Sequence, residues 1–184
     1  RPDWQILREF PGTATIDADR GLAVILGPKA MQLAIDKAKA VGVGIVTMYN
    51  AGHSGAIGHH AMIAAKQDMV GVCMTAGGLL VPPTFGAEPR LGTNPIAMAA
   101  PANSEAPFLF DAATSAIAGN KVALAKRVGA NLLAGWVSDV NGTPLTEESK
   151  VRERGDYHIL PLGGTREQGS HKGYGFSLMA EILT

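Results

Sequence analysis

The feature that most limits the fold is a hydrophobic period that switches twice between residues 28 and 75. From Pro28, near an expected helix start, apolar residues recur close to the helical spacing of 3.6, and Gly42 follows as a stop signal. The continuous apolar run VGVGIVTMY then predicts a strand buried on both faces. A second helix pattern leads to a second strand at Met69–Thr75. This alternation predicts strands joined by helical crossovers, and therefore an α/β fold.

The second half of the chain is less regular. Residues 77–95 contain several glycines and prolines and predict a long loop, which we expect to be packed because it is also apolar. Two short strands, a helix ending at Gly129, a turn at Asn141-Gly142 and a glycine-rich loop entering a last helix follow. Without a repeat or a linker, residues 1–184 are expected to form a single domain with a mixed β-sheet flanked by helices.

Composition excludes several functional classes. The chain has 16 basic and 16 acidic residues, so it lacks the excess positive charge of a nucleic-acid-binding protein. Its apolar runs are shorter than the roughly 20 residues of a membrane span. With one cysteine and no signal-peptide pattern, we expect a cytoplasmic protein. The sequence starts with Arg and stops inside a helical pattern, so we expect it to be part of a longer protein.

Three histidines lie in the stretch NAGHSGAIGHH at 50–60. His59 and His60 are adjacent and point about 100° apart on a helix, and no His-Glu-x-x-His motif is present, so we predict no metal site. We expect both to be surface or packing residues. His53 lies where a strand passes into a helix N-terminus, the edge at which open α/β sheets bind ligands. It could exchange protons with a ligand there, or only cap the helix.

Other candidates are equally open when taken alone. Lys172 lies at the glycine-lined start of the last helix, where a cation suits a phosphate better than it suits the helix dipole. Asp111 ends an apolar strand and could hold a ribose or nicotinamide group, or cap the following helix. Thr93 and Asn94 could fix the loop geometry, which is the simpler interpretation, or contact a substrate. No Gly-x-Gly-x-x-Gly motif is present.

The order of five motifs is more informative than any one of them. They are GHSGAIG at 52–58, VPPTFGAEPRLGTNPIAMAAP at 81–101, FDAATS at 110–115, GNK at 119–121, and LPLGG with HKGYG within 160–175. Together they resemble the malate/L-lactate dehydrogenase family of the second type, which includes ureidoglycolate and sulfolactate dehydrogenases. GHSGAI is most similar to the ureidoglycolate type. The resemblance runs from about Phe10 to the last residue.

This resemblance implies a non-Rossmann NAD(P)-binding fold, a homodimer, and hydride transfer between NAD or NADP and a small 2-hydroxy or 2-oxo acid such as malate, lactate or ureidoglycolate. It implies that His53 is the general acid/base or lies against the nicotinamide. The residues it implies for the cofactor are Ser54, Gly55, Ala56, Ile57, Asp111, Ala112, Ala113, Lys172 and Gly173. For the substrate it implies Thr93, Asn120 and Lys121. Asn120 departs from the family, which usually has Gly-Lys at these two positions.

The resemblance leaves one competing interpretation. The family carries its substrate-anchoring Arg in an N-terminal segment that these residues do not match, so Arg90 is the cation at hand for a carboxylate. If the 184 residues act alone, they could be a truncated, non-catalytic nucleotide-binding or dimerisation module. A metal-dependent hydrolase would need ligands that the sequence does not supply.

Overall fold

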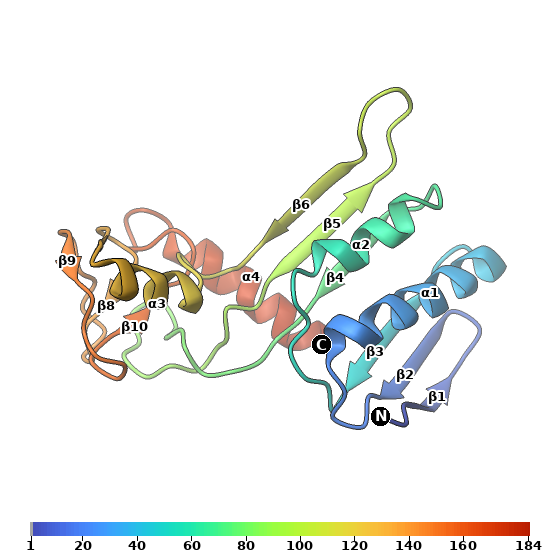
Figure 1. The fold of residues 1–184 in the computed structure, drawn as a ribbon, viewed down its shortest axis with the longest axis horizontal. Coiled ribbons are helices and arrows are strands. Elements are labelled where there is room, and N and C mark those ends of the chain that lie inside the picture. Colours follow the sequence, from blue (N-terminus) through green and yellow to red (C-terminus); the bar gives the residue numbers. More distant parts are fainter. Residues whose placement is uncertain (1) are drawn as a thin grey trace. The chain divides into compact units, whose positions relative to one another are not determined.

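The computed structural model describes residues 2–184, which form two compact units (Figure 1). The first unit comprises the chain up to Met74, Ile96–Asp111 and Thr184. The second comprises Thr75–Pro95 and Ala112–Leu183. Each unit is described by itself below. The expectation that residues 1–184 act as one domain stays a prediction.

A three-stranded mixed sheet opens the first unit. Its strands are β1 (Gln5–Glu9), β2 (Thr13–Asp17) and β3 (Ile45–Tyr49), in the order β1-β2-β3. β1 runs antiparallel to β2, whereas β3 runs parallel to β2 and is reached through helix α1 (Ala23–Val41). The predicted mixed sheet and its first helical crossover are therefore confirmed.

The limits of α1 show how a proline can be tolerated within a helix. The helix ends as predicted at Gly42, which adopts a left-handed φ of 90° and donates its N–H to Ala38 O. It begins at Ala23, however, so Pro28 lies inside it and not near its start. Proline lacks the N–H that the Val24 carbonyl would accept, and this carbonyl is near enough to the helix start for one lost bond to be tolerated.

The prediction that β3 is buried on both faces is wrong. Ile45 and Tyr49 are 56% and 62% exposed. β3 is an edge strand, and Figure 1 shows α1 along one face of its sheet. A continuous apolar run cannot distinguish a strand covered on both faces from an edge strand covered on one.

The second sheet of the first unit contains β4 (Gly71–Met74), β5 (Ile96–Ala100) and β6 (Phe108–Ala112), in that order. β4 therefore does not join β3, and the second crossover does not link two strands of one sheet. Helix α2 (Gly58–Ala65) packs on β4 and β5 (Figure 1). The core between them consists of Ile57, Ala61, Ala65, Ala97 and Ala99. These side chains are mostly small, so the helix lies close to the sheet.

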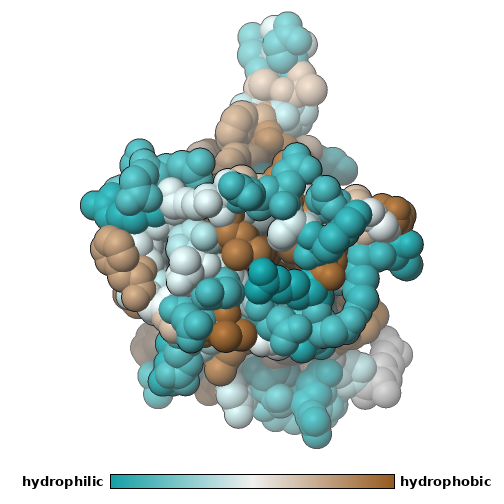
Figure 2. All heavy atoms as spheres, turned by 90° about the vertical axis from the view of Figure 1, so that its left-hand side faces the viewer, coloured by the Kyte–Doolittle hydropathy of each residue, from teal (hydrophilic) through white to brown (hydrophobic). Residues whose placement is uncertain are grey.

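The second unit has helices α3 (Gly119–Val128) and α4 (Ser170–Leu183) and two small antiparallel sheets. β7 (Asn131–Leu132) pairs with β9 (Ser149–Lys150), and β8 (Val137–Ser138) pairs with β10 (His158–Ile159). The loop at 77–95 is irregular and packed, as predicted, because Val81 and Leu91 pair with each other and are buried. The side that carries α3, β8, β9 and β10 is mainly hydrophilic (Figure 2).

The predicted α/β class is thus confirmed, with helices and small sheets in the first unit and in the second. Within residues 2–184, no helix combines the length and the apolar character that crossing a bilayer requires.

Candidate functional site

His53 lies in an irregular segment between the end of β3 and the start of α2, as the sequence predicts. Two backbone hydrogen bonds tie this segment to the start of α1. Gly52 donates its N–H to Gly21 O at 2.9 Å, and Val24 donates its N–H to His53 O at 3.1 Å. The His53 residue is exposed. The segment therefore holds its backbone in place while the imidazole stays accessible.

The tautomer of His53 follows from one contact. Gly55 donates its backbone N–H to His53 Nδ1 at 3.0 Å, so Nδ1 is an acceptor and the neutral ring carries its proton on Nε2. Gly55 has a φ of +70°, and a Cβ there would lie 2.9 Å from Val24 Cγ2. This turn therefore requires glycine for its conformation and for its space.

Asp111 does not cap the helix that follows it. The N-cap of α3 is Ala118, which makes no side-chain capping bond. Asp111 Oδ2 instead accepts the N–H of Gly58, the first residue of α2, at 2.7 Å. A carboxylate there complements the positive end of the helix dipole.

His60 is a buried packing residue, which agrees with one of the two roles expected for it. It is 3% exposed, and its Nε2 lies 3.0 Å from Ser54 O. Burial lowers the pKa of His60 below 6.5, and this effect exceeds the raising effect of the Ser54 carbonyl. His59 lowers the pKa further and Asp111 raises it. The ring is therefore neutral at pH 7.

In the second unit, two backbone hydrogen bonds and one close packing contact connect several of the predicted site residues. Thr114, which follows Ala113, donates its N–H to Thr93 O at 2.9 Å, and Leu162 donates its N–H to Thr114 O at 2.8 Å. Leu162 in turn lies against Gly173, where a Cβ would overlap the Leu162 backbone. The structure thus brings together Thr93, the 112–114 segment and the start of α4.

Lys172 lies in the first turn of α4 and is exposed. It lines an open hollow of about 320 Å³ together with His171, Phe176 and Met179. Asn120 and Lys121 lie in the first turn of α3, and both are exposed. The Lys121 ammonium lies 5.3 Å from the centroid of the Trp136 ring, a cation–π contact.

Asn94 has a structural role that the sequence did not make clear. It is 1% exposed, and its Nδ2 donates to Ser177 O, Ser177 Oγ and Glu181 Oε1 at 3.2, 2.9 and 2.9 Å. The structure therefore supports the simpler interpretation of Asn94, that it fixes loop geometry. The signals in the sequence were its place before a proline and the polar Ser177 and Glu181 within the mainly apolar second half of α4.

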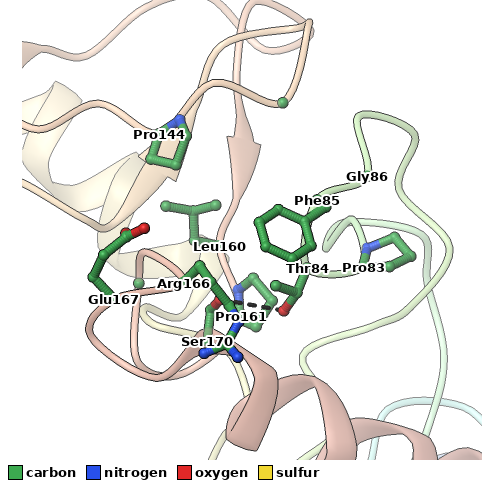
Figure 3. A pocket seen from close by; sticks show the side chains of 12 residues that line it. Pro83, Thr84, Phe85, Gly86, Pro144, Leu160, Pro161, Arg166, Glu167 and Ser170 are labelled. Atoms are coloured by element: carbon green, nitrogen blue, oxygen red, sulfur yellow. Dashed lines mark hydrogen bonds between the residues drawn. The ribbon is translucent and has the colours of Figure 1, made fainter.

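A more enclosed hollow of about 170 Å³ lies elsewhere in the second unit (Figure 3). Phe85, Pro161 and Arg166 line it, together with the Thr84 and Ser170 hydroxyls, which lie 3.2 Å apart. None of the residues predicted for cofactor or substrate lines this hollow. Arg90, the cation available for a carboxylate, pairs with Glu88 at 2.6 Å on the surface.

The predicted site residues are divided between the units. The first unit holds His53, Ser54–Ile57 and Asp111, and the second holds Thr93, Ala112, Ala113, Asn120, Lys121, Lys172 and Gly173. Their convergence on one ligand stays a prediction. Among residues 2–184, no three His, Cys, Asp or Glu side chains form a group that could hold a metal ion.

Cys73 lies in the same sheet as Asp111, and its reactivity tests how deeply this part of the sheet is buried. Burial, assisted by the negative charge of Asp111, raises the pKa of the Cys73 thiol to about 11. Relative to an ordinary thiol, the thiolate fraction at pH 8 should fall about a hundredfold. We expect a thiol reagent such as DTNB to label the folded protein correspondingly more slowly than the urea-unfolded protein. Equal rates would contradict the burial of Cys73.

Comparison with known proteins decides the family. The sequence profile described as malate/L-lactate dehydrogenase matches residues 1–184. The chain belongs to this family. It is 45% identical over 184 residues to a malate dehydrogenase of Pyrococcus horikoshii, a match that covers 100% of this chain and 50% of the relative. An L-sulfolactate dehydrogenase of Methanocaldococcus jannaschii is 42% identical over 184 residues, with 100% and 51% covered.

A solved structure within the malate/L-lactate dehydrogenase family supports the fold. The malate dehydrogenase of Pyrococcus horikoshii OT3 superposes with a TM-score of 0.84 at 42% identity, covering 99% of this chain and 48% of that one. A ureidoglycolate dehydrogenase of Escherichia coli O157:H7 is 32% identical over 183 residues, which is less than the malate and sulfolactate dehydrogenases above. The chain spans about half the length of these relatives.

Proposed function

We propose that the chain carries part of the catalytic site of an NAD(P)-dependent 2-hydroxyacid dehydrogenase. The observation that supports this most is His53, an exposed imidazole held at the end of β3 by a fixed backbone, in a chain of the malate/L-lactate dehydrogenase family. Relatives named for malate and sulfolactate favour a small 2-hydroxy acid with a second acidic group as substrate. Ureidoglycolate and lactate are further candidates.

A bound nicotinamide supplies the hydride in such a reaction. The step that we assign to this chain is the proton transfer. In the reduction His53 protonates the oxygen of the former carbonyl, and in the oxidation it removes the hydroxyl proton. Since Gly55 N–H occupies Nδ1, the neutral ring has its proton on Nε2. For Nε2 to act as a base, the proton must move to Nδ1, and the Gly55 contact must open.

The hydrogen-bond donors and the positive charge of the predicted cofactor residues fit a nicotinamide nucleotide. Ser54, Gly55 and Ala56 are partly or fully exposed beside His53, whereas Ile57 is buried in the core. Lys172 offers an exposed ammonium for a phosphate. Gly58 N–H is already taken by Asp111, so we assign no phosphate to it. Ala112, Ala113 and Gly173 would complete the cofactor contacts, and Thr93, Asn120 and Lys121 those to the substrate.

We propose the homodimer and the cytoplasmic location as well. The face of the second sheet turned away from α2 carries Val72, Phe108 and Phe110, which are 49%, 56% and 49% exposed. Apolar side chains gathered on one face favour contact with another protein surface. The competing proposal, a truncated nucleotide-binding or dimerisation module without turnover, is supported by the half-length match.

Titration with NADH and with NADPH, followed by nicotinamide fluorescence, distinguishes these proposals. We expect one of the two to bind the complete polypeptide, and oxaloacetate, pyruvate or sulfopyruvate then to oxidise it. Cofactor binding without oxidation by any 2-oxo acid would favour the non-catalytic module. If neither cofactor bound, the dehydrogenase and the nucleotide-binding module would both be wrong, and a dimerisation module would remain.

A further inference from the structure

The segment that carries His53 has a fixed backbone at both ends. Gly52 N–H is bonded to Gly21 O at the start, and Gly58 N–H is bonded to Asp111 Oδ2 at the end. Between these points the chain makes an irregular turn, with Gly55 in a left-handed conformation. Anything that holds the middle of this turn also sets the direction of the His53 ring.

His60 contacts the middle of the turn. Its Nε2 lies 3.0 Å from Ser54 O, six residues before it in the chain. Its Nδ1 is buried and has no hydrogen-bond partner among the described residues. A proton on Nδ1 would therefore be unsatisfied, whereas a proton on Nε2 is donated to the Ser54 carbonyl. The neutral Nε2–H tautomer is the form that fits this contact.

The position of the His60 ring is restricted by helix α1. A Cβ at Gly27 would lie 2.7 Å from Nε2 and 2.8 Å from Cε1, so only glycine leaves room for the imidazole there. On its other side the ring meets His59 edge-on, with centroids 5.6 Å apart. With Gly27 against it, the ring has little freedom to turn away from the Ser54 carbonyl.

We propose that His60 is a positioning residue for the predicted acid/base: by holding the Ser54 carbonyl it fixes the turn that orients His53. The proposal rests on the role of His53 given above. It assigns His60 no contact with cofactor or substrate. It also explains why a polar ring lies among the buried residues of α2, which are otherwise glycine and alanine.

The test compares His60→Leu with His60→Gln in the complete polypeptide. Leucine removes the donor, whereas the glutamine amide can place an N–H near the position of Nε2. We expect His60→Leu to speed hydrogen exchange of the Ser54–Ile57 amides about tenfold, as for the loss of one buried hydrogen bond. We expect kcat to fall about 10- to 100-fold with KM for the acid little changed, because a misplaced catalytic group lowers turnover. His60→Gln should restore most of both.

Two controls separate positioning from general damage. Lys66→Leu makes a comparable change at the exposed C-terminal end of the same helix and should alter neither readout. If His60→Leu does not fold, His60→Asn replaces it, since its shorter amide does not reach Ser54 O. Unchanged exchange in the turn, or failure of glutamine to rescue it, would overturn the proposal. If the unaltered protein shows no nicotinamide-dependent turnover, the proposed function fails, while the exchange data still decide whether His60 holds the turn.

Discussion

Replacing His53 with glutamine in the complete polypeptide is expected to lower kcat by about two to four orders of magnitude, the usual contribution of a positioned general acid/base. Glutamine keeps a polar side chain of similar reach but cannot carry a proton to or from the substrate oxygen. The His53 carbonyl, which accepts Val24 N–H, is a backbone group and survives the substitution. Binding of NADH or NADPH, measured by fluorescence, should therefore change little.

The matched control for this variant is His158→Gln. His158 lies in β10, in the second unit, and we assign it no part in the reaction. Its turnover should stay within about twofold of the unaltered protein. Turnover that survives in His53→Gln would remove this residue from the chemistry.

Replacing Asn94 with alanine should lower the free energy of unfolding of the second unit by about 3 kcal/mol. The substitution removes the donor for Ser177 O, Ser177 Oγ and Glu181 Oε1 at a position that is 1% exposed. Asn94 also has a φ of 34°, which asparagine tolerates better than alanine. Urea unfolding followed by the fluorescence of Trp136, which packs on the core of this unit, measures the loss.

Two further variants sharpen the Asn94 experiment. Asn103→Ala, in an exposed part of the chain, should change the free energy of unfolding by less than about 0.5 kcal/mol. Asn94→Asp should cost more than Asn94→Ala at pH 7, since it places a carboxylate against Glu181. An Asn94→Ala loss no larger than that of Asn103→Ala would mean that this network does not stabilise the unit.

The sequence predicted well what neighbouring residues encode. Local patterns predicted the order of the four helices and of strands β3 to β6, and the helix ends at Gly42 and Gly129. They also predicted the packed loop at 77–95 and the place of His53 between β3 and α2. The short strands β9 and β10 were not predicted. The family was also readable from the order of its motifs. The sequence-based prediction was wrong where one local pattern is compatible with two structures. The apolar run of β3 was predicted to be buried but is exposed at both ends, and Pro28 was expected near the start of α1 but lies inside it.

The contacts that shape the candidate site were decided by tertiary structure. Asp111 meets Gly58 across 53 residues of chain, Asn94 meets Glu181 across 87, and His60 fits against Gly27 on another helix. No local period records such pairs, because each depends on where folding brings distant backbone into hydrogen-bonding reach. The sequence by itself determined the elements, the family and the exposed histidine. Packing alone decided which carboxylate meets the α2 N-terminus and which buried ring holds the turn beside His53.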